Sequence, residues 1–183
     1  MPFTDTPIPD LFVFEPNIFE DARGYFFESF NTAIFAEKNI NTNFVQDNQS
    51  KSSYGVLRGL HYQLNPFSQA KLVRVISGEV LDVAVDIRQN SPTYGQHFSI
   101  ILSAENKKQL YIPRGFAHGF AVLSETAEFF YKCDNFYSKE HDAGIIYNDV
   151  SLNIDWILKP DMILVSEKDK NLPALISSKN NFI

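Results

Sequence analysis

The 183-residue sequence predicts an all-β protein, a sandwich or barrel of antiparallel strands with a few short helices. Short apolar segments recur about every ten residues with turn residues between them. Within one segment, Val83, Val85 and Ile87 alternate with acidic or small residues, which is the period of a half-buried strand. The chain also contains 17 phenylalanines, the kind of bulk that two facing sheets require between them.

The first predicted element is a two-turn helix over 30–38, which follows the possible capping residues Ser29 and Asn31. Strands are predicted over 56–63, 71–76, 80–87, 98–102, 109–112, 119–123 and 127–133. The connection Ser77-Gly78-Glu79 predicts a hairpin between the second and third of these strands. Residues 160–183 are more polar and predict a short helix and a tail that close one end of a single domain, 1–183.

Composition excludes several classes of partner. The net charge of -6 argues against nucleic-acid or acidic-membrane binding. The single cysteine, Cys133, permits no internal disulfide and favours the cytoplasm. The first residues do not resemble a signal peptide, and no apolar stretch approaches the ~20 residues of a membrane span. We therefore expect a cytoplasmic protein.

Ionisable side chains occur on strand faces that otherwise carry apolar residues. Lys71, His118 and Tyr131 each share parity with apolar neighbours in their predicted strands. Taken singly, His61 or Tyr131 is more often a satisfied core residue, and a lysine often extends to solvent at a strand end. Several such groups in one barrel, however, are costly to bury without partners. Together they predict a polar ligand pocket.

Two motifs resemble the cupin superfamily, whose fold is a jelly-roll β-barrel. Pro113-x-Gly115-x-x-His118 is similar to the second cupin motif. The place of the first motif, which normally supplies a His-x-His pair and a glutamate to a metal, reads His61-Tyr62-Gln63. Zinc and iron sites usually need three or four nitrogen, oxygen or sulfur ligands. With Gln63 in place of the second histidine, we expect no metal.

Longer motifs resemble one cupin branch, the dTDP-4-dehydrorhamnose 3,5-epimerases. The similarity extends from about residue 21 to residue 169, and its motifs lie at 46–48, 55–63, 69–75, 82–88, 112–120 and 131–132. The resemblance implies an isomerase that converts dTDP-4-dehydro-6-deoxyglucose, a 4-keto sugar, into dTDP-4-dehydro-L-rhamnose without a cofactor. It also implies a homodimer that forms by exchange of N-terminal strands.

The resemblance further implies roles for individual residues. His61 is the base, Asp169 orients it, Tyr131 is the acid, and Lys71 faces the sugar carbonyl. Tyr137 stacks on the thymine. The remaining substrate contacts are Arg23, Glu28, Gln46, Asp47, Asn48, Arg58, His118, Asp142 and Lys168, and Asp142 replaces a glutamate that is usual in the family.

These residue types suit the chemistry of a 4-keto sugar. The protons at C3 and C5 are acidified by the C4 carbonyl, so their removal needs a base, an acid on the opposite face and a cation near the oxygen. Histidine titrates near neutrality, and a carboxylate partner fixes its tautomer. Arg58 and His61 have opposite parity, so either Gly59 hosts a bulge, or Arg58 serves the rim or a second subunit.

Three alternatives remain open. The first is an epimerase that acts at C3 or C5 only, or on another nucleotide's 4-keto sugar. The second is a metal-dependent cupin oxygenase, which Gln63 disfavours. The third is a cupin that binds a sugar without catalysis, which would have no need for both an acid and a base.

Overall fold

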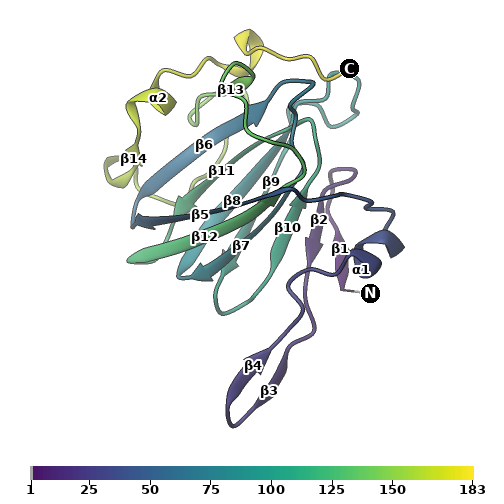
Figure 1. Cartoon of the computed structure of the whole chain (residues 1–183). Coiled ribbons are helices and arrows are strands. Elements are labelled where there is room, and N and C mark those ends of the chain that lie inside the picture. The colour runs from purple at the N-terminus through teal and green to yellow at the C-terminus, as the bar shows by residue number, and fades with distance from the viewer. Residues whose placement is uncertain (1) are drawn as a thin grey trace.

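The computed structural model describes residues 2–183, and most of its strands form two facing sheets (Figure 1). The first sheet has the strand order β1, β2, β10, β7, β12, β5: Phe3–Asp5, Phe12–Phe14, Gln109–Ile112, Lys71–Ser77, Thr126–Cys133 and Gln46–Ser53. The second has the order β13, β6, β11, β8, β9: Asp142–Gly144, Val56–Gln63, Phe116–Val122, Glu79–Asp86 and His97–Ser103. Strand β14, Leu164–Val165, pairs in parallel with β6.

A third, two-stranded sheet projects from this body as a hairpin (Figure 1). It consists of β3, Phe19–Asp21, and β4, Gly24–Phe26. Three of its aromatic side chains are mostly exposed: Phe19 by 65%, Tyr25 by 59% and Phe26 by 66%. An isolated hairpin is marginally stable in water, and exposed apolar clusters mark contact surfaces. This hairpin therefore has the character of an element that binds another surface.

The all-β prediction is confirmed, and each of the seven predicted strands is present with ends shifted by at most three residues. The predicted helix is also present as α1, Thr32–Glu37, and Asn31 caps it by accepting a hydrogen bond from the Ala33 N–H. Strand β5 was not predicted, because its sequence QDNQSKSS has no apolar alternation. Among residues 2–183, no helix is long and apolar enough to cross a membrane.

The predicted hairpin between β7 and β8 is wrong. Strand β7 pairs with β10 and β12, whereas β8 pairs with β11 and β9 in the other sheet. Gly78 makes this sharp change of sheet with a φ of +80°, and a Cβ there would lie 2.1 Å from the Thr126 carbonyl oxygen. A three-residue connection with a glycine can join two strands of facing sheets as well as two strands of one hairpin, so the sequence did not distinguish them.

The interpretation of β8 as a half-buried strand is also wrong, because both of its faces are covered. Ala84 belongs to the core between the sheets, which includes Val73 and Phe129 from the first sheet. Val83 and Val85 belong to a second core on the outer face of the second sheet. That outer core is completed by chain segments after β12, including Ile145, Leu152, Trp156 and Phe182.

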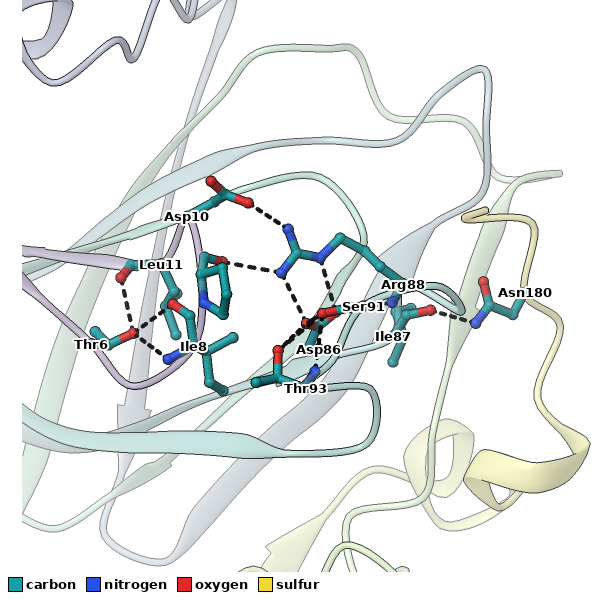
Figure 2. Close-up of polar contacts among 11 residues, drawn as sticks. Thr6, Ile8, Asp10, Leu11, Asp86, Ile87, Arg88, Ser91, Thr93 and Asn180 are labelled. Atoms are coloured by element: carbon teal, nitrogen blue, oxygen red, sulfur yellow. Dashed lines mark hydrogen bonds and ion pairs between the residues drawn. The ribbon is translucent and has the colours of Figure 1, made fainter.

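A polar network fastens both ends of the chain near the end of β8 (Figure 2). Buried Asp86 accepts hydrogen bonds from Arg88 and Ser91, and Arg88 also binds Asp10 of the N-terminal loop. Burial alone raises the pKa of Asp86, but these hydrogen bonds outweigh it and leave the pKa below its usual range. In the C-terminal segment, Asn180 donates to the Ile87 carbonyl oxygen at 2.6 Å.

Candidate active site

A cavity of about 840 Å³ lies between the two sheets and opens beside the C-terminal segment. This volume falls in the range of small-molecule sites and is large enough for a sugar with an attached nucleotide. Ten of the predicted site residues line it: Asn48, Arg58, His61, Lys71, His118, Tyr131, Tyr137, Asp142, and Lys168 and Asp169 from the segment after β14. Residues as far apart in the sequence as Asn48 and Asp169 therefore meet at one site between the two sheets.

A bulge in β6 brings Arg58 and His61 to the same cavity. His118 of β11 pairs with His61, and Phe120 pairs with Arg58, so three steps along β6 match two along β11. Gly59 has a φ of +128°, and a Cβ there would lie 2.5 Å from the Gly119 Cα. Only glycine fits this close approach. Of the arrangements that the sequence left open, the bulge is the one in the structure.

His61 forms a short hydrogen bond with Asp169 of α2, Glu167–Lys170. Its Nε2 lies 2.7 Å from Asp169 Oδ1, and Oδ2 of the same carboxylate accepts the Gly59 N–H at 3.3 Å. Burial raises the pKa of Asp169, but the hydrogen bond and charge of His61 outweigh that effect, so the pKa lies below its usual range. Asp169 is only 3% exposed, whereas the His61 side chain remains 33% exposed toward the cavity. A histidine held in this way has a fixed ring orientation.

A second histidine–carboxylate pair lies deeper in the cavity. His118 Nε2 is 2.9 Å from Oδ2 of Asp82, which is fully buried on β8. Burial lowers the pKa of His118, although Asp82 opposes the shift. Sequence analysis missed Asp82 as a site residue because its alternation with valines was interpreted as an exposed face. The signal available in the sequence was parity: Asp82 lies on the same face of β8 as Ala84, and that face points to the core between the sheets.

Tyr131 and Lys71 approach from the opposite wall, on β12 and β7 of the first sheet. The Lys71 Nζ lies 5.9 Å from the Tyr131 ring centroid. Burial raises the pKa of Tyr131, so the hydroxyl keeps its proton at neutral pH. Burial lowers the pKa of Lys71, while Cys133, Asp82 and Asp142 oppose that shift. The inward parity predicted for Lys71, His118 and Tyr131 is confirmed.

At the rim, Tyr137, Asp142 and Lys168 are connected. The Tyr137 hydroxyl donates to Asp142 Oδ2 at 3.3 Å, and the same oxygen forms an ion pair with the Lys168 ammonium at 2.5 Å. Asp142 lies opposite Gln63 in the pairing of β13 with β6. Although it is shorter than glutamate, Asp142 therefore reaches the rim and anchors two of the predicted site residues.

Four predicted substrate contacts do not line the cavity. Arg23 and Glu28 belong to the projecting hairpin and its base, where Arg23 pairs with Asp21. Asp47 has the opposite parity to Asn48 and pairs with Lys132 on the other face of the sheet. Gln46 lies just outside the lining, and its side chain binds Asn48 and the Tyr137 N–H.

The residues at the places of the cupin metal ligands do not fit a metal. Nε2 of His61 and Nε2 of His118 are engaged by Asp169 and Asp82. The Gln63 amide binds only backbone groups of nearby loops. Across the described part of the chain, no three His, Cys, Asp or Glu side chains gather as a metal-binding group.

Comparison with known proteins identifies the family of this chain. The family model described as dTDP-4-dehydrorhamnose 3,5-epimerase matches residues 5–177. The chain belongs to this family. It is therefore an isomerase of the racemase and epimerase class.

Individual relatives of this epimerase family match almost the whole chain. The dTDP-4-dehydrorhamnose 3,5-epimerase of Shigella flexneri is 58% identical over 167 residues, which cover 91% of each chain. The crystal structure of the enzyme from Elizabethkingia anophelis superposes with a TM-score of 0.92 at 56% identity, covering 94% of both chains. The structure of dTDP-6-deoxy-D-glucose-3,5-epimerase from Legionella pneumophila in complex with dTDP-4-keto-L-rhamnose also has a TM-score of 0.92, at 50% identity, and covers 96% of this chain and 93% of that chain.

Proposed function

We propose that this chain epimerises dTDP-4-keto-6-deoxyglucose at both C3 and C5 to give dTDP-4-keto-L-rhamnose. The observation that carries the proposal is the placement of His61 and Tyr131 on opposite walls of one cavity, with His61 bound to Asp169. Inversion of a carbon centre requires a proton to leave from one face and another to arrive on the opposite face. Relatives that share about half or more of their residues with this chain carry the same activity in their names.

In the proposed reaction, His61 removes the proton from C5 or C3, and the electron pair moves into the C4 carbonyl to form an enolate. The Lys71 ammonium stabilises the enolate oxygen, whose negative charge in turn favours the charged form of lysine. Tyr131 then donates its proton to the opposite face of the same carbon. Asp169 stabilises the imidazolium that forms on His61. The two residues regain their starting protonation states by exchange with solvent.

The rest of the pocket suits a nucleoside diphosphate. Arg58 lines it, and its guanidinium is oriented by two hydrogen bonds to Ser52 Oγ at 3.2 and 3.1 Å. A guanidinium in a fixed orientation can bind diphosphate oxygens with two parallel hydrogen bonds. We assign the other substrate contacts to Asn48, His118 and Lys168, and the base to the exposed ring of Tyr137.

The proposal is tested by incubation of the protein with dTDP-4-keto-6-deoxyglucose in deuterated water, followed by NMR at C3 and C5. We expect deuterium and inverted configuration at both carbons, and the same rates after exhaustive chelation. Inversion at one carbon only would identify a mono-epimerase. Activity that disappears on chelation and returns with a stoichiometric transition metal would contradict the side-chain mechanism.

We also propose that the protein is a homodimer in which the β3–β4 hairpin of each protomer completes the partner's pocket. Arg23 and Glu28 lie outside the pocket of their own chain, although both match substrate-contact positions of the family. The Arg23 side chain is 90% exposed at the hairpin tip, next to the exposed rings of Tyr25 and Phe26. Insertion into a second copy would bury these rings and bring a cation to the diphosphate.

Combining an impaired variant with an inactive one in the same dimer tests this arrangement. We expect Arg23→Ala to lower kcat/KM about 10-fold or more, because a charged contact to the substrate is lost. His61→Ala is expected to be inactive. In heterodimers formed by coexpression, the intact pocket of the Arg23→Ala chain receives the intact hairpin of the His61→Ala chain. We therefore expect roughly a quarter of wild-type activity to return, because half of the dimers then contain one complete site of two. No recovery from isolated heterodimers would rule out the shared site.

A further inference from the structure

Gln63 stands where the cupin motif has a metal-binding histidine, and in this protein it is 5% exposed at the end of β6. Its amide is fully used by backbone groups. Nε2 donates to the carbonyl oxygens of Phe67 at 2.8 Å and Phe136 at 3.1 Å, and Oε1 accepts the Ser138 N–H at 2.6 Å. A buried amide with this many partners leaves unsatisfied groups behind when it is removed.

Two of these hydrogen bonds hold the peptide groups on both sides of Tyr137. The Phe136 carbonyl belongs to the peptide unit that precedes Tyr137, and the Ser138 N–H belongs to the unit that follows it. The Tyr137 N–H itself donates to Gln46 Oε1 at 3.4 Å. The segment 134–141 contains no helix or strand, so its main chain has no ladder of its own to hold it. Gln69 Nε2 holds the Asn135 carbonyl oxygen at 2.7 Å, and the Gln63 amide holds the two peptide groups that flank Tyr137.

The side chain of Tyr137, in contrast, is exposed to solvent. It is 58% exposed and lines the mouth of the cavity, and its hydroxyl is fixed by Asp142. An aromatic ring with an accessible face is a platform on which a nucleobase can stack. If the ring is held in place before the ligand arrives, binding does not have to restrict its motion, and the affinity is higher.

We infer that Gln63 is a positioning residue for base recognition, which holds Tyr137 so that its ring is ready to stack on the thymine of dTDP. The inference rests on the proposed function, because a nucleotide substrate brings the base to this rim. In this inference Gln63, which stands where the cupin motif has a metal-binding histidine, contributes to nucleotide affinity. The chemistry at the sugar stays with His61 and Tyr131.

The first test is Gln63→Met, which keeps the length of the side chain and removes the amide. By calorimetry we expect its Kd for dTDP to rise about fivefold or more, because the ring must now be ordered on binding. The Kd for inorganic pyrophosphate, which has no base, should not change. At saturating substrate, kcat and deuterium wash-in should stay within about twofold of wild type. Asn180→Leu is the matched control, since it removes an amide that binds two backbone groups of residues outside the cavity lining, and it should leave all these values unchanged.

A double-variant cycle shows whether Gln63 acts through Tyr137. Tyr137→Ala alone is expected to weaken dTDP binding about 10- to 100-fold, the scale of stacking between a base and an aromatic ring. Gln63→Met combined with Tyr137→Ala should then be no weaker than Tyr137→Ala, within about twofold. Additive losses, or a folded Gln63→Met protein with wild-type affinity for dTDP, would overturn the inference.

Gln63→Glu supplies a second readout in case the methionine variant folds poorly. Its carboxylate still accepts the Ser138 N–H but repels the two carbonyl oxygens, so dTDP binding should be weak at about pH 8. Burial raises the pKa of this carboxyl, and the protonated form donates to one carbonyl, so the loss relative to wild type should shrink toward about pH 5.5. A loss of dTDP affinity that does not depend on pH would contradict the role of the Gln63 amide in holding Tyr137. Failure of the wild-type protein to bind dTDP would instead contradict the proposed function.

Discussion

Replacement of His61 by asparagine is expected to abolish deuterium exchange at both C3 and C5. His61 is the base of the proposed mechanism, and a positioned acid–base group contributes about 100-fold or more to a rate. Asparagine is preferable to alanine because the buried Asp169 carboxylate, 2.7 Å from His61 Nε2, then retains a polar neighbour. The loss should appear in kcat, with the Kd for dTDP close to wild type, because the proposed mechanism places His61 at the sugar and not at the nucleotide.

A matched substitution separates this effect from a general effect of histidine loss. His97 on β9 is partly buried, and its pKa is lowered by that burial, but it does not line the cavity. His97→Asn should therefore exchange both protons at the wild-type rate. If His61→Asn still exchanges either proton at that rate, a second base exists, and the assignment of His61 to both steps is wrong. Thermal unfolding of both variants checks that the fold is intact.

The inner strands and the inward-facing ionisable residues were predictable because their signals are local. Each strand between residues 56 and 133 carries its own apolar pattern, and the parity of Lys71 and Tyr131 follows from that pattern. The opposite parity of Arg58 and His61 indicated a bulge at Gly59 as one of three arrangements, and the sequence alone did not choose between them. A strand that packs one apolar face against the core shows this in its sequence.

Other features depend on contacts that no local pattern records. Strand β5 is polar throughout and is a strand because it pairs along its whole length with β12. Asp169 lies in a polar segment, 108 residues from His61 in sequence, so its role was implied only by the family resemblance. Asp82 was missed because its alternation with valines was interpreted as an exposed face, and its partner His118 lies on another strand. The backbone partners of Gln63 at Phe136 and Ser138 lie 73 and 75 residues away in sequence. In each case, the tertiary structure selects the partner and the sequence supplies only a suitable side chain.

The substitution Tyr131→Phe is expected to separate proton removal from inversion. His61 remains in place, so the enolate still forms and can take a deuteron back from the same face, which labels the starting sugar. Inversion needs a donor on the opposite wall, where Tyr131 lies beside Phe129 with ring centroids 6.1 Å apart. Burial raises the pKa of Tyr131, so its hydroxyl is protonated and able to donate at neutral pH. We expect deuterium wash-in near the wild-type rate and a loss of epimerised product of about 100-fold.

The change keeps the ring and removes one oxygen, so packing in the core should be nearly unaffected, with a stability change within about 1 kcal/mol. Tyr111→Phe is the matched control: it removes a buried hydroxyl that lies 2.8 Å from Thr42 Oγ1, outside the cavity, and should leave both wash-in and product formation unchanged. Wild-type amounts of epimerised sugar from Tyr131→Phe would show that water or another side chain delivers the proton. Loss of wash-in together with product would instead place Tyr131 in the deprotonation step. Labelled starting sugar without inverted product is the result that only an acid on the opposite wall from His61 produces.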